Sequence, residues 1–292
     1  MTATLHTPAT HTPATLEAPT RPRRKRPRSN VQAGELSTHV QRLPGGREDA
    51  PLVVFVHGLL TDSLASYYFT LAPDLAAAGV DVLMYDLRGH GRTDRPATGY
   101  RLERFVDDLA NLLDALGERR PAHVVGNSFG GTIAAGLAAW YPEKVATATM
   151  IESEPPTATW TRHMSAGLAD AKARLAEEVV INWIEDNHGE HTARLSRGAS
   201  TILASTTLAE DIPHSRVIGD DLAELTCPLL AVFGDESGLS EQVPDLRARL
   251  PRCRTVVLPE QGHSVLIEKP TETRDLVLGW VREHHAAVVA AR

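Results

Sequence analysis

The sequence of 292 residues predicts an α/β fold, with a doubly wound, mostly parallel sheet and an inserted helical lid. Two observations carry this prediction. Short apolar runs alternate with longer segments of helical periodicity, and one long stretch without convincing strands interrupts the alternation. Short apolar runs are typical of parallel strands, because helices cover both faces of such a sheet. The alternation of strands and helices therefore favours a doubly wound architecture.

The predicted core occupies two separate segments, residues 36–155 and residues 222–292. Helical spacing of apolar residues predicts helices over residues 63–78, 102–116 and 132–140. The strands are expected in the runs PLVVFVHG (from Pro51), VDVLMYDLRG (from Val80), AHVVGN (from Ala122), VATATMI (from Val145), PLLAVFG (from Pro228) and RTVVLPEQGH (from Arg254).

Residues 156–221 form the predicted lid between the two core segments. The run SAGLADAKARLAEEVVINWIEDN, from Ser165 to Asn187, has the spacing of an amphipathic helix. An insertion of this kind would lie over the sheet and cover a substrate cavity. Trp160, Met164 and Trp183 are the candidates for lining that cavity, and the alternative is that they form the core of the lid itself.

Residues 1–35 differ in composition and predict a disordered tail. The pentapeptide HTPAT occurs twice, from His6 and from His11, and the basic run RPRRKRPR follows from Arg21 to Arg28. Repeats of threonine, proline and alanine offer little apolar surface to bury. No apolar segment follows the paired arginines, so the pattern does not predict an export signal.

Composition and charge favour a cytoplasmic protein that acts on a small molecule. The net charge is −7 and hydrophobic residues make up 42% of the chain, which is ample for a core. These values argue against nucleic acid or an anionic membrane surface as a partner. The two cysteines, Cys227 and Cys253, each precede an expected strand and are interpreted as buried thiols rather than a disulfide.

The run VGNSFGG, from Val125 to Gly131, has the pattern of a catalytic turn. Gly126, Ser128 and Gly130 form G-x-S-x-G between an expected strand and an expected helix. In such a nucleophile elbow the glycines permit a strained backbone that exposes the serine hydroxyl at the edge of the sheet. The alternative interpretation is a glycine-rich packing turn.

Four motifs together resemble the α/β-hydrolase fold family, from about Leu52 to the C-terminus. They are HGLL at 57–60, DLRGHGRT at 86–93, GNSFGG at 126–131 and QGH at 261–263. The resemblance implies that Ser128 is the nucleophile and His263 the general base. It also implies that the backbone N–H groups of Leu59 and Phe129 form the oxyanion hole.

The third catalytic residue has two candidates. The usual position for the acid in this family, three residues after the glycine that ends the seventh strand, holds Ser237, with Asp235 close by. A carboxylate is nevertheless needed to orient the histidine. Glu152 directly follows the sixth expected strand and resembles a minority arrangement in which a glutamate there serves as the acid. We expect Glu152 to be the acid, with Asp235 as the alternative.

Serine at the elbow favours acyl transfer over the dehalogenase and epoxide-hydrolase chemistries of this fold, which use aspartate there. The predicted activity is hydrolysis of a carboxylic ester or acyl thioester through an acyl-enzyme intermediate. A carrier-bound acyl chain is among the candidate substrates, and a role in secondary metabolism is a further hypothesis. This chemistry needs no metal or organic cofactor, and no histidine pair has convincing metal-ligand spacing.

Two other functions stay open. GNSFGG is also similar to the elbow of the meta-cleavage-product hydrolases, which break a carbon–carbon bond, although Ser237 departs from their pattern. The other alternative is a hydrolase-like protein that binds a small ligand without catalysis.

Overall fold

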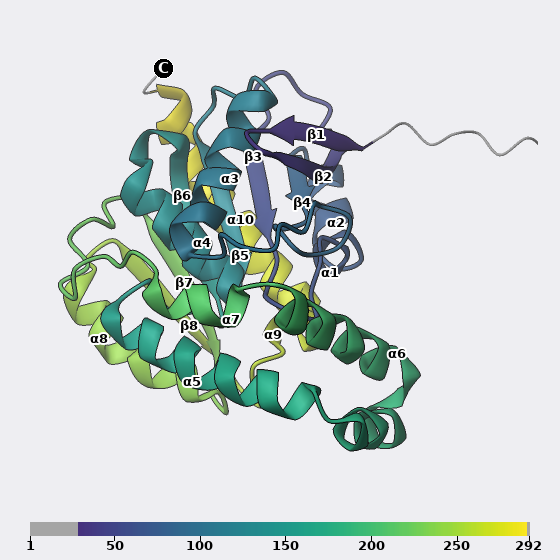
Figure 1. The fold of residues 1–292 in the computed structure, drawn as a ribbon. Coiled ribbons are helices and arrows are strands. Elements are labelled where there is room, and N and C mark those ends of the chain that lie inside the picture. The colour runs from purple at the N-terminus through teal and green to yellow at the C-terminus, as the bar shows by residue number, and fades with distance from the viewer. Residues whose placement is uncertain (1–28, 291–292) are drawn as a thin grey trace, which may run out of the picture.

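The computed structural model describes residues 29–290 and contains one sheet of eight strands (Figure 1). The strand order is β1-β2-β4-β3-β5-β6-β7-β8, and the strands from β3 to β8 run parallel. Their bounds are β1 Asn30–Ala33, β2 Leu36–Leu43, β3 Leu52–Val56, β4 Asp81–Tyr85, β5 Ala122–Asn127, β6 Val145–Ile151, β7 Leu229–Gly234 and β8 Cys253–Leu258. The predicted mostly parallel sheet is confirmed.

Helices cover both faces of the sheet, as the short apolar strands require. Alternate residues of β3 point to opposite faces: Val54 belongs to the core cluster that includes residues of α3, α4 and α8, and Val53 to the cluster that includes residues of α2 and α10. The α-helices are α1 Ala65–Tyr68, α2 Ala72–Ala77, α3 Leu102–Ala115, α4 Phe129–Trp140, α5 Ala158–Leu175, α6 Glu178–Ser205, α7 Leu208–Asp211, α8 Val243–Arg249, α9 Val265–Glu268 and α10 Pro270–Ala290. Three 3-10 helices are η1 Pro142–Lys144, η2 Ile212–His214 and η3 Gly238–Gln242.

The segment predicted as one helix over residues 63–78 forms two short helices, α1 and α2. Pro73 lies in the first turn of α2. Proline has no backbone N–H to donate to the preceding turn, so a continuous helix would lose a hydrogen bond there. The prediction of a single helix was wrong for this physical reason.

The predicted tail boundary at residue 35 was also wrong, because β1 and β2 form an antiparallel hairpin at the edge of the sheet. Asn30 pairs with His39, and Ala33 pairs with Leu36 across a turn at Gly34. Gly34 has a φ of 57°, which glycine adopts without strain. An edge strand carries polar residues on its exposed face, and this explains the polar composition of β1 and the turn after it. The rest of the predicted tail, before residue 29, lies outside the described residues.

A helical insertion, comprising α5, α6, α7 and η2, separates β6 from β7. Figure 1 shows it across the carboxyl ends of the parallel strands. The Asp211 carboxylate accepts the backbone N–H groups of Gly99 and Tyr100, 3.1 and 2.9 Å away, and so fixes the insertion to the core. Non-helical backbone at Gly189, with a φ of 85°, divides α6 into two parts. That this insertion acts as a lid stays a prediction.

Candidate active site

Ser128 occupies a sharp turn between β5 and α4. Its backbone has a φ of 52° and a ψ of −125°, a conformation that non-glycine residues rarely adopt. The flanking glycines make room for this turn. A Cβ atom on Gly126 would lie 2.0 Å from the carbonyl oxygen of Gly130, and one on Gly130 would lie 2.0 Å from that of Val56. The turn therefore needs the glycines that the motif supplies.

His263 lies in the loop between β8 and α9, at the same edge of the sheet. Its Nε2 atom is 3.2 Å from the Ser128 hydroxyl oxygen. This distance permits transfer of the hydroxyl proton to the imidazole. The His263 side chain is 54% exposed, so a substrate or a water molecule has access to the pair.

Glu152 directly follows β6, and its side chain is fully buried. The Oε2 atom of Glu152 lies 3.1 Å from the Nδ1 atom of His263. An Nδ1–H donated to this carboxylate leaves Nε2 unprotonated and facing the serine. Asp235, the alternative acid, instead accepts the backbone N–H of Gln261 at 3.3 Å. Of the two predicted acids, the structure brings Glu152 to the histidine.

The loop after β3 passes next to the serine. A Cβ atom on Gly58 would lie 3.5 Å from the Ser128 Cβ atom. In the hydrogen bonds of residues 29–290, the N–H groups of Leu59 and Phe129 donate to no protein atom. Both groups are thus available to an oxyanion, and their role as an oxyanion hole stays a prediction.

Two side chains, Asp62 and His90, fix this loop. The Asp62 carboxylate accepts the Gly58 N–H at 2.7 Å. The His90 Nε2 atom accepts the Leu60 N–H at 2.8 Å. Burial lowers the pKa of His90 to about 3, so the ring is neutral and can accept a hydrogen bond. The contact of Asp62 was not part of the sequence prediction. The signal that could have found it is an aspartate four residues after Gly58, because aspartate commonly accepts backbone N–H groups in turns.

Residues 51–199, just over half of the chain, match the sequence profile of the alpha/beta hydrolase fold. The chain belongs to the α/β-hydrolase fold family. One relative of this hydrolase is the 2-(acetamidomethylene)succinate hydrolase of Mesorhizobium japonicum, which is 26% identical over 86% of this chain and 94% of its own. Another is the 3-oxoadipate enol-lactonase 1 of Acinetobacter baylyi, 24% identical over 87% and 96%.

A solved structure shares the fold of this α/β hydrolase. Est816, described as an N-acyl homoserine lactone degrading enzyme, superposes with a TM-score of 0.68. The two chains are 24% identical, and the match covers 86% of this chain and 99% of Est816. At this identity the likeness concerns the fold.

Of the three predicted substrate-contacting residues of this α/β hydrolase, two pack against one core cluster and the third is exposed. Trp160 is buried and stacks on Phe129, with ring centroids 6.2 Å apart, and Met164 packs against the same core. Trp183 is 57% exposed and packs against His188. The part of α6 before Gly189, which carries Trp183, lies at the outer end of the insertion (Figure 1), and that Trp183 contacts substrate stays a prediction.

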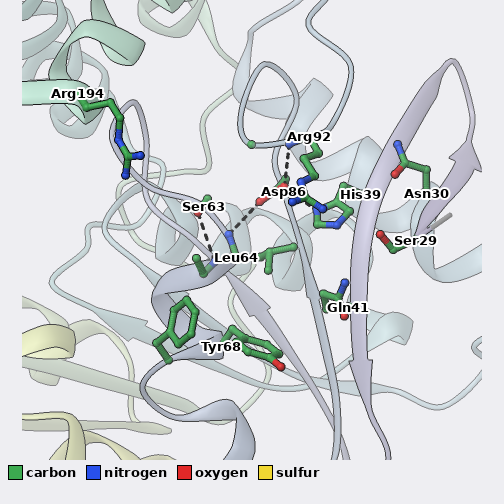
Figure 2. A pocket seen from close by; sticks show the side chains of 13 residues that line it. Ser29, Asn30, His39, Gln41, Ser63, Leu64, Tyr68, Asp86, Arg92 and Arg194 are labelled. Atoms are coloured by element: carbon green, nitrogen blue, oxygen red, sulfur yellow. Dashed lines mark hydrogen bonds and ion pairs between the residues drawn. The ribbon is translucent and has the colours of Figure 1, made fainter. Parts of the chain in front are cut away.

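A cavity of about 1300 Å³ opens elsewhere, beside the β1–β2 hairpin (Figure 2). Its lining includes His39 from β2, Asp86 after β4 and Arg194 from α6. Asp86 has a structural role there, since its carboxylate pairs with His39 Nδ1 at 2.8 Å and accepts the Leu64 N–H at 3.0 Å. Ser128 and its two partners do not line this cavity, so it does not define the substrate path.

Neither a metal cluster nor a membrane-spanning helix is found in the described part of the chain. No group of three or more histidine, cysteine, aspartate or glutamate side chains among residues 29–290 has metal-binding geometry. The same residues contain no helix that combines the length and the apolar composition needed to cross a bilayer.

Cys227 and Cys253 are both free and half-buried, and burial raises their pKa values to about 11 and about 12.

Proposed function

We propose that this α/β hydrolase is a cofactor-independent serine hydrolase that cleaves a carboxylic ester or acyl thioester. One observation carries the proposal. Ser128, His263 and Glu152 form a continuous row of hydrogen-bonded side chains, with distances of 3.2 and 3.1 Å. A hydroxyl, an imidazole and a carboxylate in this order can generate a nucleophile at neutral pH.

The proposed reaction begins with attack of the Ser128 hydroxyl oxygen on the substrate carbonyl carbon. His263 Nε2 takes the hydroxyl proton, while Glu152 stabilises the resulting imidazolium. The N–H groups of Leu59 and Phe129 donate to the oxyanion of the tetrahedral intermediate. Collapse of this intermediate breaks the C–O or C–S bond, and His263 returns the proton to the departing alcohol or thiol. Water then attacks the acyl-enzyme by the same steps and releases the acid.

The name of one related protein supports an ester-type substrate. The relative from Acinetobacter baylyi is an enol-lactonase. A lactone is a cyclic ester, and its cleavage fits the proposed acyl-enzyme chemistry. Carbon–carbon bond hydrolysis and ligand binding without catalysis are the alternatives that the experiment must separate.

A substrate panel tests the proposal. Purified protein is assayed on p-nitrophenyl esters, lactones, acyl thioesters and a dienol-acid substrate for carbon–carbon cleavage, with Ser128→Ala as the control. We expect turnover of at least one ester, lactone or thioester, and loss of this turnover in Ser128→Ala while the melting temperature stays unchanged. Turnover of the dienol acid alone would establish the carbon–carbon alternative. Equal activity in wild type and Ser128→Ala would refute the nucleophile.

A further inference from the structure

Ser237 occupies the turn after β7, three residues beyond Gly234, where its hydroxyl meets the buried carboxylate of Glu152. The Ser237 Oγ atom lies 2.6 Å from the Oε2 atom of Glu152. Ser237 is 8% exposed and Glu152 is fully buried, so water competes little for this contact. The same Oε2 atom faces His263 Nδ1 at 3.1 Å. The Oε2 atom of Glu152 thus contacts both the Ser237 hydroxyl and the His263 imidazole.

The direction of the hydrogen bond follows from the chemistry of the partners. An ionised carboxylate only accepts hydrogen bonds, so the Ser237 hydroxyl must donate. The Ser237 oxygen also accepts the backbone N–H of Leu239 at 3.3 Å. The serine therefore has both its donor and an acceptor lone pair occupied, and its hydroxyl proton is directed at Glu152.

The other carboxylate oxygen is held as well. The Oε1 atom of Glu152 accepts the backbone N–H of Gly234. A buried carboxylate is costly unless hydrogen bonds compensate for its lost hydration. Glutamate also has several rotatable side-chain bonds, whereas the imidazole needs an acceptor at one fixed place. Gly234 and Ser237 together meet both requirements from the end of β7.

We propose that Ser237 is a positioning residue of the active site, which holds the Glu152 carboxylate oxygen that orients His263. This inference rests on the proposed function, because it assigns Ser237 a role only through the Glu152–His263 pair. The serine then takes part in catalysis without contacting substrate. Its place in the turn after β7 lets Ser237 reach the carboxylate of Glu152, which follows the neighbouring strand β6.

Ser237→Ala removes the hydroxyl, and we expect kcat to fall about tenfold, the usual weight of one hydrogen bond to a charged group. KM should stay within about twofold, because Ser237 acts through Glu152 and away from the substrate.

Two further variants separate positioning from a structural effect. Ser237→Thr keeps the hydroxyl and should restore kcat to near the wild-type value, with KM unchanged. Ser153→Ala removes another buried hydroxyl close by, which contacts Thr132 at 3.3 Å, and should change neither parameter. The melting temperature of each variant is measured as well. A lower value in Ser237→Ala reports the stability lost with the contact to Leu239, independently of kcat. A normal kcat in Ser237→Ala, or a lowered kcat that Ser237→Thr does not restore, would overturn the proposal.

Glu152→Gln, measured in parallel, distinguishes this proposal from the proposed function. If Glu152→Gln loses most activity while Ser237→Ala behaves as wild type, the role of Ser237 is refuted and the triad stands. If Glu152→Gln is itself fully active, the assignment of the acid fails, and with it the basis for a role of Ser237.

Discussion

At the scale of single residues, the proposed catalytic chemistry depends on how the buried carboxylate of Glu152 is held. Glu152 has a φ of 49°, outside the range that side-chain-bearing residues favour. Its backbone N–H donates to the Val232 carbonyl at 2.8 Å, which fixes this conformation at the end of β6. The strained backbone aims the carboxylate across the sheet edge toward β7 and the histidine. Strain of this kind persists only where surrounding contacts impose it.

The two candidate acids give opposite expectations. Glu152→Gln should lower kcat by about 10³- to 10⁴-fold, because an amide does not stabilise the imidazolium and favours the wrong tautomer. Asp235→Asn should stay within about threefold of wild type, since Asp235 is exposed and contacts Gln261 rather than His263. Steady-state kinetics on the best ester substrate decide between them. A large loss in Asp235→Asn together with normal kcat in Glu152→Gln would reverse the assignment.

The sequence indicated Ser128 and His263 through local motifs, and Glu152 through its place after an expected strand. The role of Ser237 could not be predicted in this way. Its contact with Glu152 joins residues that are 85 positions apart and depends on how the turn after β7 closes on the end of β6. No local sequence pattern predicts a contact between residues so far apart in the chain.

At the scale of elements, the expected strands after residue 50 could be predicted because each is apolar and short. The β1–β2 hairpin could not, because its exposed edge carries polar residues that resemble a loop. The break between α1 and α2 has a different cause, because Pro73 interrupts the helix and is visible in the sequence. The elbow is the element where prediction was sharpest, because steric exclusion at its glycines leaves few alternative sequences.

Gly130→Ala tests the steric account of the elbow. A Cβ atom at this position would lie 2.0 Å from the Val56 carbonyl oxygen, so we expect a loss of several kcal/mol of stability or failure to fold. Gly198→Ala is the matched control. Gly198 lies within α6, where an added Cβ meets no atom within 4 Å, and alanine there should stabilise by about 0.5–1 kcal/mol. Equal stability of the two variants in urea unfolding would contradict the account.

At the scale of the whole molecule, the layered architecture followed from the order of strands and helices. The orientation of the insertion did not, since an amphipathic helix shows that one face is buried but does not show against what. Trp183 illustrates this, because its helix segment turns outward at Gly189.

Buried histidines also affect the stability of the whole chain, as His123 shows at the start of β5. Its Nδ1 atom lies 2.9 Å from the Thr147 hydroxyl oxygen.

Burial lowers the pKa of His123 to about 3, which predicts acid lability. Between about pH 6.5 and pH 3 the unfolded chain binds a proton at this residue and the folded chain does not. The contribution of neutral His123 to the free energy of unfolding is therefore fully present above about pH 6.5. It falls as the pH drops, by at most about 1.4 kcal/mol per pH unit. Urea unfolding at pH 7 and pH 5 should show a smaller loss for His123→Gln than for wild type. An equal loss would place the acid sensitivity elsewhere.

Covalent labelling of Ser128 tests the central claim most directly, because it reports an activated serine without knowledge of the substrate. The folded protein is treated with a fluorophosphonate probe and digested, and the labelled peptide is identified by mass spectrometry. We predict one adduct on Ser128, slowed at least tenfold in His263→Ala, since the hydroxyl without its base is a weak nucleophile. A folded protein that gives no adduct, or an adduct on another residue, would contradict the account.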